Sequence, residues 1–454
     1  MQTNFSQEQL NDPDVKEADR ILRRCVHCGF CTATCPTYVV LGDERDSPRG
    51  RIYAIKDMLE KGIDAKPEVS THVDRCLSCF SCMTTCPSGV DYMHLVEIAR
   101  KHIEKTGHRS FKDQLIRRAL TQIVPYPRRF RWALRAAPFG RRLAPTLRKL
   151  NFPELAAMVE LAPLQKLHAG RFRGPGMASP TGVRTGRVIM LAGCAQQVLR
   201  PEINDATIRL FARGGIDVIV SAGAGCCGAL SQHIGHEEEA IAAAKVNVDA
   251  WSKEIAKGGV DAVIINTSGC GTTVKDYGHL LKHETEYAKR AKDISAMAKD
   301  VTEFLDQYDI GAPKRWSSLK VAYHAACSLQ HGQRVTTQPK ALLKKAGFTV
   351  LDVPEAHLCC GSAGIYNIVQ PEIAGALRDR KAANIKPLRP DVVAAGNIGC
   401  ITQLQTALDV PVVHTIELLD WAHGGPVPPG LEALEKYSTD VPQPKTSVED
   451  YIGA

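Results

Sequence analysis

Eight of the sixteen cysteines form two blocks with one spacing, C-x2-C-x2-C-x3-C-P. The blocks are Cys25, Cys28, Cys31, Cys35-Pro36 and, 51 residues later, Cys76, Cys79, Cys82, Cys86-Pro87. This spacing is typical of cubane [4Fe–4S] clusters of the bacterial ferredoxin type, in which the fourth cysteine of each block binds the other cluster. The sequence therefore predicts two clusters. Their expected ligands are Cys25, Cys28, Cys31 and Cys86 for the first, and Cys76, Cys79, Cys82 and Cys35 for the second.

Zinc is the alternative metal for these blocks, because C-x2-C pairs also bind zinc. Zinc sites usually separate two such pairs by a longer gap. Three closely spaced cysteines followed by Cys-Pro suit a tetrahedral ion poorly, so the spacing favours the iron–sulfur interpretation.

The other eight cysteines form a longer repeat. Each copy has a single cysteine, a Cys-Cys-Gly motif and a later cysteine, and the copies are offset by 133 or 130 residues. Four thiolates per copy are enough for one further Fe–S cluster or one zinc ion. The two candidate sites are Cys194, Cys226, Cys227 and Cys270, and Cys327, Cys359, Cys360 and Cys400. Buried structural cysteines are the alternative, but two copies in register favour metal binding in at least one.

Several histidines lie near these motifs in the sequence. They are His27 in the first block and His233, His236, His324, His331 and His357 in the repeats. Any of them could complete a site or relay a proton. Taken singly, each is more typical of a loop, solvated or capping histidine.

The surrounding pattern predicts the elements that carry the cysteines. Helices are expected at 13–24, 50–61 and 92–106, giving an α-helical ferredoxin domain. Short apolar runs alternate with helical stretches in both later repeats, which indicates parallel sheets with helical cover and cysteines at the carboxyl ends of strands. The expected class is α+β multidomain, an α-helical ferredoxin domain followed by a duplicated α/β cysteine-rich domain. The expected divisions are residues 1–106, a basic helical segment and linker at 107–186, a first repeat at 187–310, a second repeat at 311–425 and a C-terminal extension at 426–454.

The basic charge is concentrated in one stretch. Residues 100–187 hold 20 Lys and Arg against 4 Asp and Glu, whereas the whole chain has a net charge of only +8. Aromatic residues such as Phe130, Trp132 and Phe139 lie among the arginines. We rank docking of a partner's acidic face first and contact with anionic lipid second. A solvated helical face accounts for some of the charge, and no motif supports nucleic-acid binding.

Composition and missing motifs narrow the function further. The 454 residues are 44% hydrophobic, as in globular proteins, and no apolar run reaches the ~18–20 residues of a membrane span. The polar N-terminus does not resemble a secretory signal, so we expect a cytoplasmic protein, with peripheral contact at the cytoplasmic face of the inner membrane as a further possibility. No dinucleotide fingerprint, Walker loop or Ser/His/Asp constellation is readable. The chain is equipped to carry electrons but has no evident site for an organic substrate.

The cysteine motifs and their neighbours resemble those of the iron–sulfur subunits of bacterial glycolate oxidase (glycolate dehydrogenase). The resemblance covers about residues 17–420. It is carried by residues 24–36, 48–51, 225–229, 268–271 and 357–364. It implies an electron-transfer subunit with no substrate oxidation of its own. A complex with FAD-containing subunits would convert glycolate to glyoxylate, and this subunit would pass electrons to a membrane quinone or another acceptor.

Related architectures keep other functions open. Iron–sulfur subunits of lactate and glycerol-3-phosphate dehydrogenase complexes share the motif order, as does heterodisulfide reductase. In the last, the C-terminal motif ends in C-x-x-C, and Thr267 and Asn397 stand here in place of the first cysteine of that pair. This departure argues against five-cysteine clusters and disulfide reduction. A zinc-stabilised scaffold without redox function is the alternative from a different class.

Overall fold

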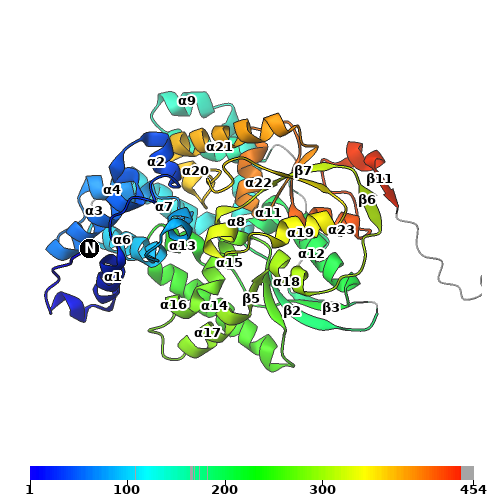
Figure 1. Cartoon of the computed structure of the whole chain (residues 1–454), viewed down its shortest axis with the longest axis horizontal. Helices are drawn as coiled ribbons and strands as arrows, with labels where there is room; N and C mark the ends of the chain where they lie inside the picture. The colour runs from blue at the N-terminus through cyan, green and yellow to red at the C-terminus, as the bar shows by residue number, and fades with distance from the viewer. Residues whose placement is uncertain (108, 164–166, 168, 173, 181, 441–454) are drawn as a thin grey trace, which may run out of the picture.

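The N-terminal part of the chain is helical and holds both cysteine blocks in its loops. The computed structural model describes residues 1–440 except 108, 164–166, 168, 173 and 181 (Figure 1). The helices of this part are α1 Pro13–Arg24, α2 Pro36–Leu41, α3 Pro48–Lys61, α4 Pro67–Asp74, α5 Ser81–Thr85 and α6 Tyr92–Thr106. The three helices expected here are confirmed, with α3 starting two residues earlier than expected.

Local capping explains where these helices begin. Asp12 accepts a hydrogen bond from the backbone N–H of Asp14, and Ser47 accepts one from that of Gly50. A proline follows each cap, where its missing N–H costs nothing. The apolar faces of α1, α3 and α6 then pack into one core, in which Ile21, Ile55, Leu95 and Ile103 are fully buried.

The basic segment forms four helices: α7 Phe111–Ile123, α8 Pro127–Arg141, α9 Ala144–Lys149 and α10 Pro153–Leu161. Ile116 and Leu120 of α7 pack against Ile234 and Ile365, one from each repeat. α8 has no buried residue. The segment is therefore attached to the body through α7 and α10, whose Ala156 and Ala157 are buried, and α8 remains largely exposed.

The first repeat contains a five-stranded sheet in the order β1-β3-β2-β4-β5. Its strands are β1 Gly176–Ala178, β2 Gly186–Leu191, β3 Ile216–Val220, β4 Ala262–Ile265 and β5 Ala298–Asp300, all parallel except β1. Its helices are α11 Gln196–Leu199, α12 Glu202–Arg213, α13 Ala229–His233, α14 Glu237–Ala256, α15 Ser268–Lys275, α16 Tyr277–Leu280, α17 Ala288–Met297 and α18 Val301–Gln307. β1 lies in the stretch expected as linker. It pairs antiparallel with the edge strand β3 through backbone bonds, which the Gly-, Pro- and Ser-rich composition does not reveal.

The second repeat contains a four-stranded parallel sheet in the order β10-β9-β7-β8. Its strands are β7 Lys320–His324, β8 Thr349–Asp352, β9 Val392–Ala395 and β10 Val412–His414, with a small separate sheet of β6 Arg315–Ser317 and β11 Ser438–Asp440. Its helices are α19 Gln338–Lys345, α20 Tyr366–Val369, α21 Pro371–Ile385, α22 Ile398–Gln405 and α23 Thr415–Ala422. Read from the other edge, the order β8-β7-β9-β10 repeats β3-β2-β4-β5. The parallel sheets and their internal duplication are therefore confirmed.

The two repeats share a hydrophobic core. Val188 and Ile264 of the first repeat belong to the same buried cluster as Val321 and Val393 of the second. The side chain of Arg200 pairs with Glu417 across the junction at 3.0 Å. The expected boundary at residue 310 therefore separates two sheets but not two independent cores, and the domain divisions stay a prediction.

The chain after the second repeat is partly integrated into the body. Leu431 is fully buried in the shared core, and β11 pairs with β6. The remainder of the expected C-terminal extension, residues 441–454, lies outside the described residues.

Candidate metal centres

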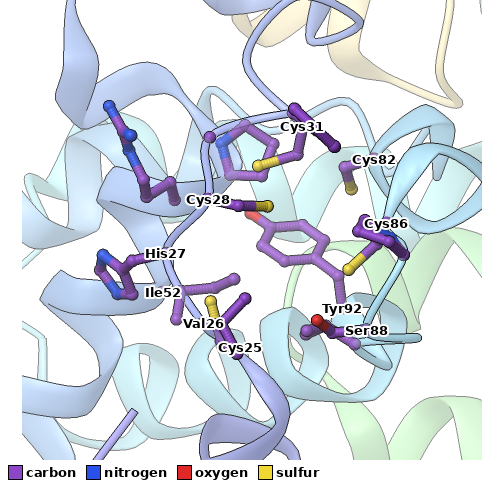
Figure 2. A pocket seen from close by; sticks show the side chains of 16 residues that line it. Cys25, Val26, His27, Cys28, Cys31, Ile52, Cys82, Cys86, Ser88 and Tyr92 are labelled. Carbon is purple, nitrogen blue, oxygen red and sulfur yellow. The ribbon is translucent and has the colours of Figure 1, made fainter.

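The first pocket gathers cysteines from both ends of the ferredoxin-type domain. Cys25, Cys28 and Cys31 of the first block line it together with Cys86, the last cysteine of the second block. Figure 2 shows their thiols directed toward one space. Gly29, at φ 84°, gives the loop the left-handed turn that brings Cys28 and Cys31 to the same side. Cys28 is exposed, so this pocket reaches the surface.

The second pocket is deeper and uses the complementary set. Its thiols come from Cys76, Cys79 and Cys82 of the second block and from Cys35 of the first. All four are buried. The crossed grouping in the two pockets is that expected from the ferredoxin spacing, and the soft thiol lining fits iron–sulfur clusters. The ligand assignment itself stays a prediction.

The two pockets adjoin each other. Cys82, Pro48 and Tyr92 line both of them. The hydroxyl of Tyr92 donates to the Cys76 sulfur at 3.7 Å. The two pockets are thus in contact through these shared side chains.

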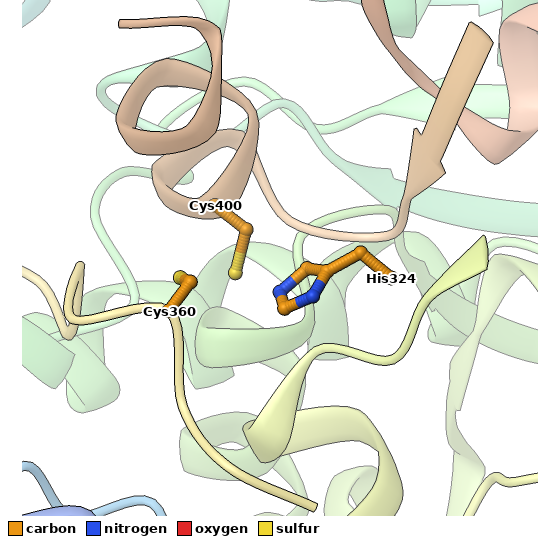
Figure 3. Close-up of side chains that lie close together, drawn as sticks. All are labelled: His324, Cys360 and Cys400. Atoms are coloured by element: carbon orange, nitrogen blue, oxygen red, sulfur yellow. The ribbon is translucent and has the colours of Figure 1, made fainter. Parts of the chain in front are cut away.

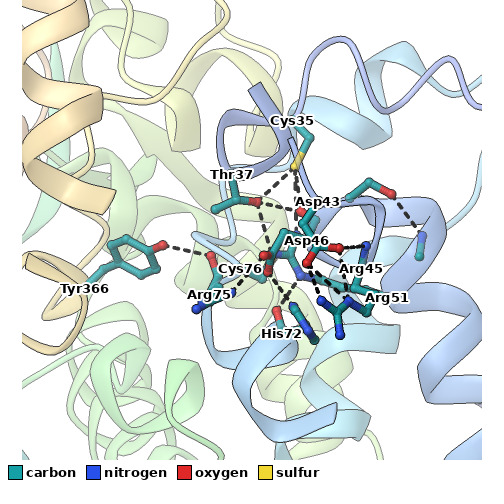
Figure 4. A network of polar contacts seen from close by, with 12 residues as sticks. Cys35, Thr37, Asp43, Arg45, Asp46, Arg51, His72, Arg75, Cys76 and Tyr366 are labelled. Atoms are coloured by element: carbon teal, nitrogen blue, oxygen red, sulfur yellow. Dashed lines mark hydrogen bonds and ion pairs between the residues drawn. The ribbon is translucent and has the colours of Figure 1, made fainter. Parts of the chain in front are cut away.

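A buried cationic network supports the second pocket (Figure 4). Arg51 is 1% exposed; its Nη1 donates to the Cys35 sulfur at 3.8 Å, and its Nη2 pairs with Asp46 at 3.3 Å. His72 and Arg75 also bind Asp46, at 2.9 and 3.0 Å. The guanidinium is therefore fixed beside a cysteine sulfur and compensates negative charge there.

These cations oppose the effect of burial on the thiols. Burial raises the pKa of Cys76, but Arg51 and Arg100 outweigh it and leave the pKa below its ordinary value. Arg100 also donates to the Cys76 carbonyl at 2.7 Å. Burial raises the pKa of Cys79 and Cys82 well above the ordinary value. A metal ligand must be a thiolate, so Cys76, whose pKa is lowered, loses its proton more readily than Cys79 or Cys82.

Sequence reasoning missed the residues of this network. Arg51 belongs to a quoted motif, yet no pattern links it to Cys35. Asp46, Tyr92 and Arg100 carry no signal in a single sequence. Their role arises only when α3, α4 and α6 pack together.

In the first repeat the four expected cysteines lie close together. The sulfurs of Cys226 and Cys194 are 3.7 Å apart, and Cys227 and Cys270 complete the group. Side-chain hydrogen bonds with Cys194 and Cys227 hold the pKa of the Cys226 thiol well below its ordinary value. The three segments that bring these thiols together follow β2, β3 and β4, at the carboxyl ends expected from the sequence.

In the second repeat the corresponding cysteines also meet. The sulfurs of Cys327 and Cys359 are 3.6 Å apart, and Cys360 and Cys400 lie beside them, all but Cys327 buried. Cys359 packs in one cluster with Cys79 of the second pocket. The second repeat's cysteines therefore adjoin the ferredoxin-type domain, an arrangement that the sequence does not reveal.

Asn397 and Thr267, which stand in place of the additional cysteine of the C-x-x-C motif, form hydrogen bonds instead. Asn397 caps α22 by accepting from the Gly399 N–H at 3.2 Å. Thr267 donates to the side chain of Gln196. Both repeats are thus built for four cysteines.

The glycine of each Cys-Cys-Gly motif is required by close packing. Gly361 has φ +87°, and a Cβ there would lie 2.5 Å from the Ala374 carbonyl oxygen of α21. Gly228 has φ +89°, with the Ala240 carbonyl oxygen 3.0 Å from such a Cβ. Both glycines let a helix backbone approach the loop that carries the vicinal cysteines.

We expect Gly361→Ala to destabilise the second repeat, because it adds both backbone strain and a clash with α21. The expected loss is about 1–3 kcal/mol or more, measured by denaturant unfolding under anaerobic conditions. Gly375→Ala is the matched control in the same helix. Nothing lies within 4 Å of its added Cβ, so it should be neutral or slightly stabilising. Equal stability of the two variants would contradict the packing argument.

Among the described helices, none combines the length and the apolar composition that a membrane crossing requires.

Comparison with known proteins agrees with this arrangement. Residues 21–90 match the family model of a 4Fe-4S dicluster domain, and residues 188–275 and 321–405 match that of a cysteine-rich domain. A crystal structure of a hypothetical protein from Helicobacter pylori has a similar fold, with a TM-score of 0.51 and 10% identity over 92% of this chain and 74% of that chain.

Two curated relatives match over nearly their whole length. The glycolate oxidase iron-sulfur subunit of Escherichia coli is 41% identical over 93% of this chain and 99% of its own. A probable glycolate oxidase iron-sulfur subunit of Bacillus subtilis is 32% identical over 89% of this chain and 94% of its own. The cysteine pockets, the duplicated cysteine-rich repeat and these matches agree, and the chain belongs to the family of glycolate oxidase iron-sulfur subunits.

Proposed function

We propose that this chain conducts electrons within a complex that oxidises glycolate to glyoxylate. The observation that carries the proposal is the pair of adjoining cysteine-lined pockets, in which the last cysteine of each block lies with the first three of the other block. The clusters they hold would supply one-electron redox chemistry. The residues of the chain hold the thiolates in place, exclude water from the second site and fix compensating cations beside it.

The substrate-oxidising step belongs to a partner in this proposal. Oxidation of glycolate releases two electrons and two protons, which an FAD-containing subunit accepts. This chain then takes the electrons one at a time and passes them to a quinone or another acceptor. The names of the relatives support glycolate over lactate or glycerol 3-phosphate as the substrate of the complex.

The exposed edge of the first pocket is the proposed contact for one redox partner. Val26 is 67% and Phe30 is 63% exposed, and both lie in the loop that carries Cys28. Tyr53 on the neighbouring helix is 61% exposed. Apolar and aromatic side chains around a surface cysteine site suit a protein interface. The second pocket, in contrast, faces the second repeat.

The exposed α8 is proposed as a second contact surface. Trp132 and Phe139 are 69% and 84% exposed, and Arg135 lies over the Trp132 ring at 5.2 Å. Some of the segment's charge is used internally, since Arg109 and Arg117 both pair with Asp74. Within α8, Arg129 and Arg141 donate to backbone carbonyls of the segment. Arg131 and Arg135 are proposed to meet an acidic face, with docking of the flavin subunits ranked before anionic lipid.

We expect the double variant Arg131→Glu, Arg135→Glu to weaken assembly with the partner subunits, most strongly at low salt where charge attraction is least screened. Co-purification of the complex at low and high salt measures the effect. Lys289→Glu, a charge reversal on an exposed residue of α17, is the control. Loss of binding to anionic vesicles with normal assembly would favour the lipid interpretation. Unchanged behaviour in both assays would exclude α8 as a contact surface.

A further inference from the structure

The second repeat has a buried histidine where the first repeat has a leucine. His324 ends β7 opposite Ala395 of β9, and Leu191 ends β2 opposite Ile265 of β4. Because the strand orders of the two sheets correspond, these are equivalent positions. His324 is 1% exposed. An imidazole at an otherwise apolar, buried position needs a polar partner or a bound ion.

The ligand atoms of His324, Cys360 and Cys400 converge within 4.8 Å of one another. Figure 3 shows the imidazole directed toward the two sulfurs, of which Cys360 lies in the loop after β8 and Cys400 in the first turn of α22, after β9. Nε2 of His324 is buried and has no hydrogen-bond partner. Of the cysteines of the first repeat, all of which the structure describes, no three converge in this way. The second repeat thus presents a buried nitrogen without a hydrogen-bond partner toward two thiols.

A sulfur is also available for the fourth position of a tetrahedral site. The Cys359 thiol lies within hydrogen-bond distance of the Cys360 thiol, and Cys360 in turn contacts Cys400. The sulfur of Cys327 is 3.6 Å from that of Cys359. A member of the Cys327–Cys359 pair therefore lies close enough to be the fourth ligand beside His324, Cys360 and Cys400.

Charge at the site also differs between the repeats. Lys381 of α21 is 2% exposed, donates to the Glu355 carbonyl at 2.6 Å, and lies within electrostatic reach of Cys359, Cys360 and Cys400. The equivalent residue on α14 is the neutral Asn247, as the matching contacts of Ala374 and Ala240 show. Three thiolates, a neutral imidazole and a divalent ion carry a net charge of −1, which the ammonium of Lys381 balances.

We propose that the second repeat binds a divalent transition-metal ion of zinc's borderline softness through His324, Cys360, Cys400 and one sulfur of the Cys327–Cys359 pair. The mixed imidazole and thiolate set matches this class of ion. Four protein ligands leave no open position, so the site is structural. It fixes the loops of the second repeat against Cys79 and the second pocket. The proposal does not depend on the substrate of the complex.

The test uses the full chain, purified anaerobically from medium supplemented with Zn²⁺. Zinc-edge X-ray absorption of the unaltered protein should show nitrogen at about 2.0–2.1 Å together with sulfur at about 2.3 Å. His324→Leu, which copies the first repeat, should lower zinc retention against a chelator by more than about tenfold, the range that even outer-shell changes reach. His357→Leu, close in sequence but outside the donor group, should retain zinc like the unaltered protein.

Three results would overturn the proposal. They are absence of zinc from the unaltered protein, a sulfur-only zinc signal that His324→Leu leaves unchanged, and additional iron with labile sulfide at Cys360 and Cys400 in place of zinc. If His324→Leu fails to fold, the absorption spectrum of the unaltered protein still decides whether nitrogen is a ligand.

Discussion

Replacing Cys28 with serine should reduce acceptor reduction by the assembled complex to background, while the chain still folds and joins its partners. Cys28 is exposed at the rim of the first pocket and contributes nothing to the helical core. Its loss should therefore affect the cluster and leave the scaffold intact. A serine hydroxyl is a much poorer ligand for iron than a thiolate. Bound flavin should still be reduced by glycolate, because that step takes place on the partner.

The measurement combines acceptor reduction, flavin reduction and iron content of the purified complex. Iron should fall from about eight toward about four per chain, since one of two cubanes is affected. Thr32→Ser in the same loop is the control. It retains the hydroxyl that donates to the Gly29 carbonyl at 2.7 Å. If Cys28→Ser keeps full acceptor reduction, this chain is not the electron conduit.

Replacing Arg51 with methionine should have the largest effect on stability. Arg51 is buried with Asp46, and removal of one partner leaves a buried charge incompletely compensated. Losses of this kind reach about 3–5 kcal/mol. His72 and Arg75 keep partial contact with Asp46, which favours the lower end of that range. Denaturant unfolding of the anaerobic protein measures the loss.

The same variant should also lower the reduction potential of the second cluster. Reduction adds a negative charge, which the guanidinium beside Cys35 stabilises, so its removal disfavours the reduced form. Redox titration followed by EPR measures the shift. Lys61→Met in the same helix is the control, because Lys61 lines neither pocket and forms an exposed pair with Asp57 worth at most about 1 kcal/mol. An unchanged potential together with unchanged stability would contradict the assigned role of Arg51.

Interactions between residues close in the sequence were sufficient to predict much of the fold. Asp12 with Pro13 and Ser47 with Pro48 determine where α1 and α3 begin through interactions within one turn. The strands of both repeats follow from short apolar runs, as β7 over Lys320–His324 illustrates. The cysteine spacing predicts which four thiols share a pocket, because a tight loop can place only its first three cysteines around one centre.

Contacts between segments far apart in the chain could not be predicted from the sequence in this way. β1 forms by backbone pairing, which is nearly independent of side-chain type. Arg51 reaches Cys35 only because α3 packs beneath the first block. His324 stood out in the sequence merely as one of several histidines near cysteines. Its burial and its direction toward Cys360 and Cys400 depend on how a loop after β8 and the start of α22 pack around β7.

Three of the cysteine groups adjoin one another and differ in their exposure to solvent. The first pocket opens to the surface at Cys28, the second is buried behind it, and the second repeat's Cys359 adjoins the second pocket through Cys79. Electrons can therefore enter or leave at the first pocket, while the second repeat covers the second pocket on the side of Cys79.

The most direct test of the central claim is the iron and acid-labile sulfide content of the anaerobically purified chain, with EPR after dithionite reduction. The account predicts about eight irons and about eight sulfides per chain, with the interacting signals of two cubane clusters. Zinc in place of iron at the N-terminal cysteines, with no signal on reduction, would contradict electron conduction and leave a zinc-stabilised scaffold.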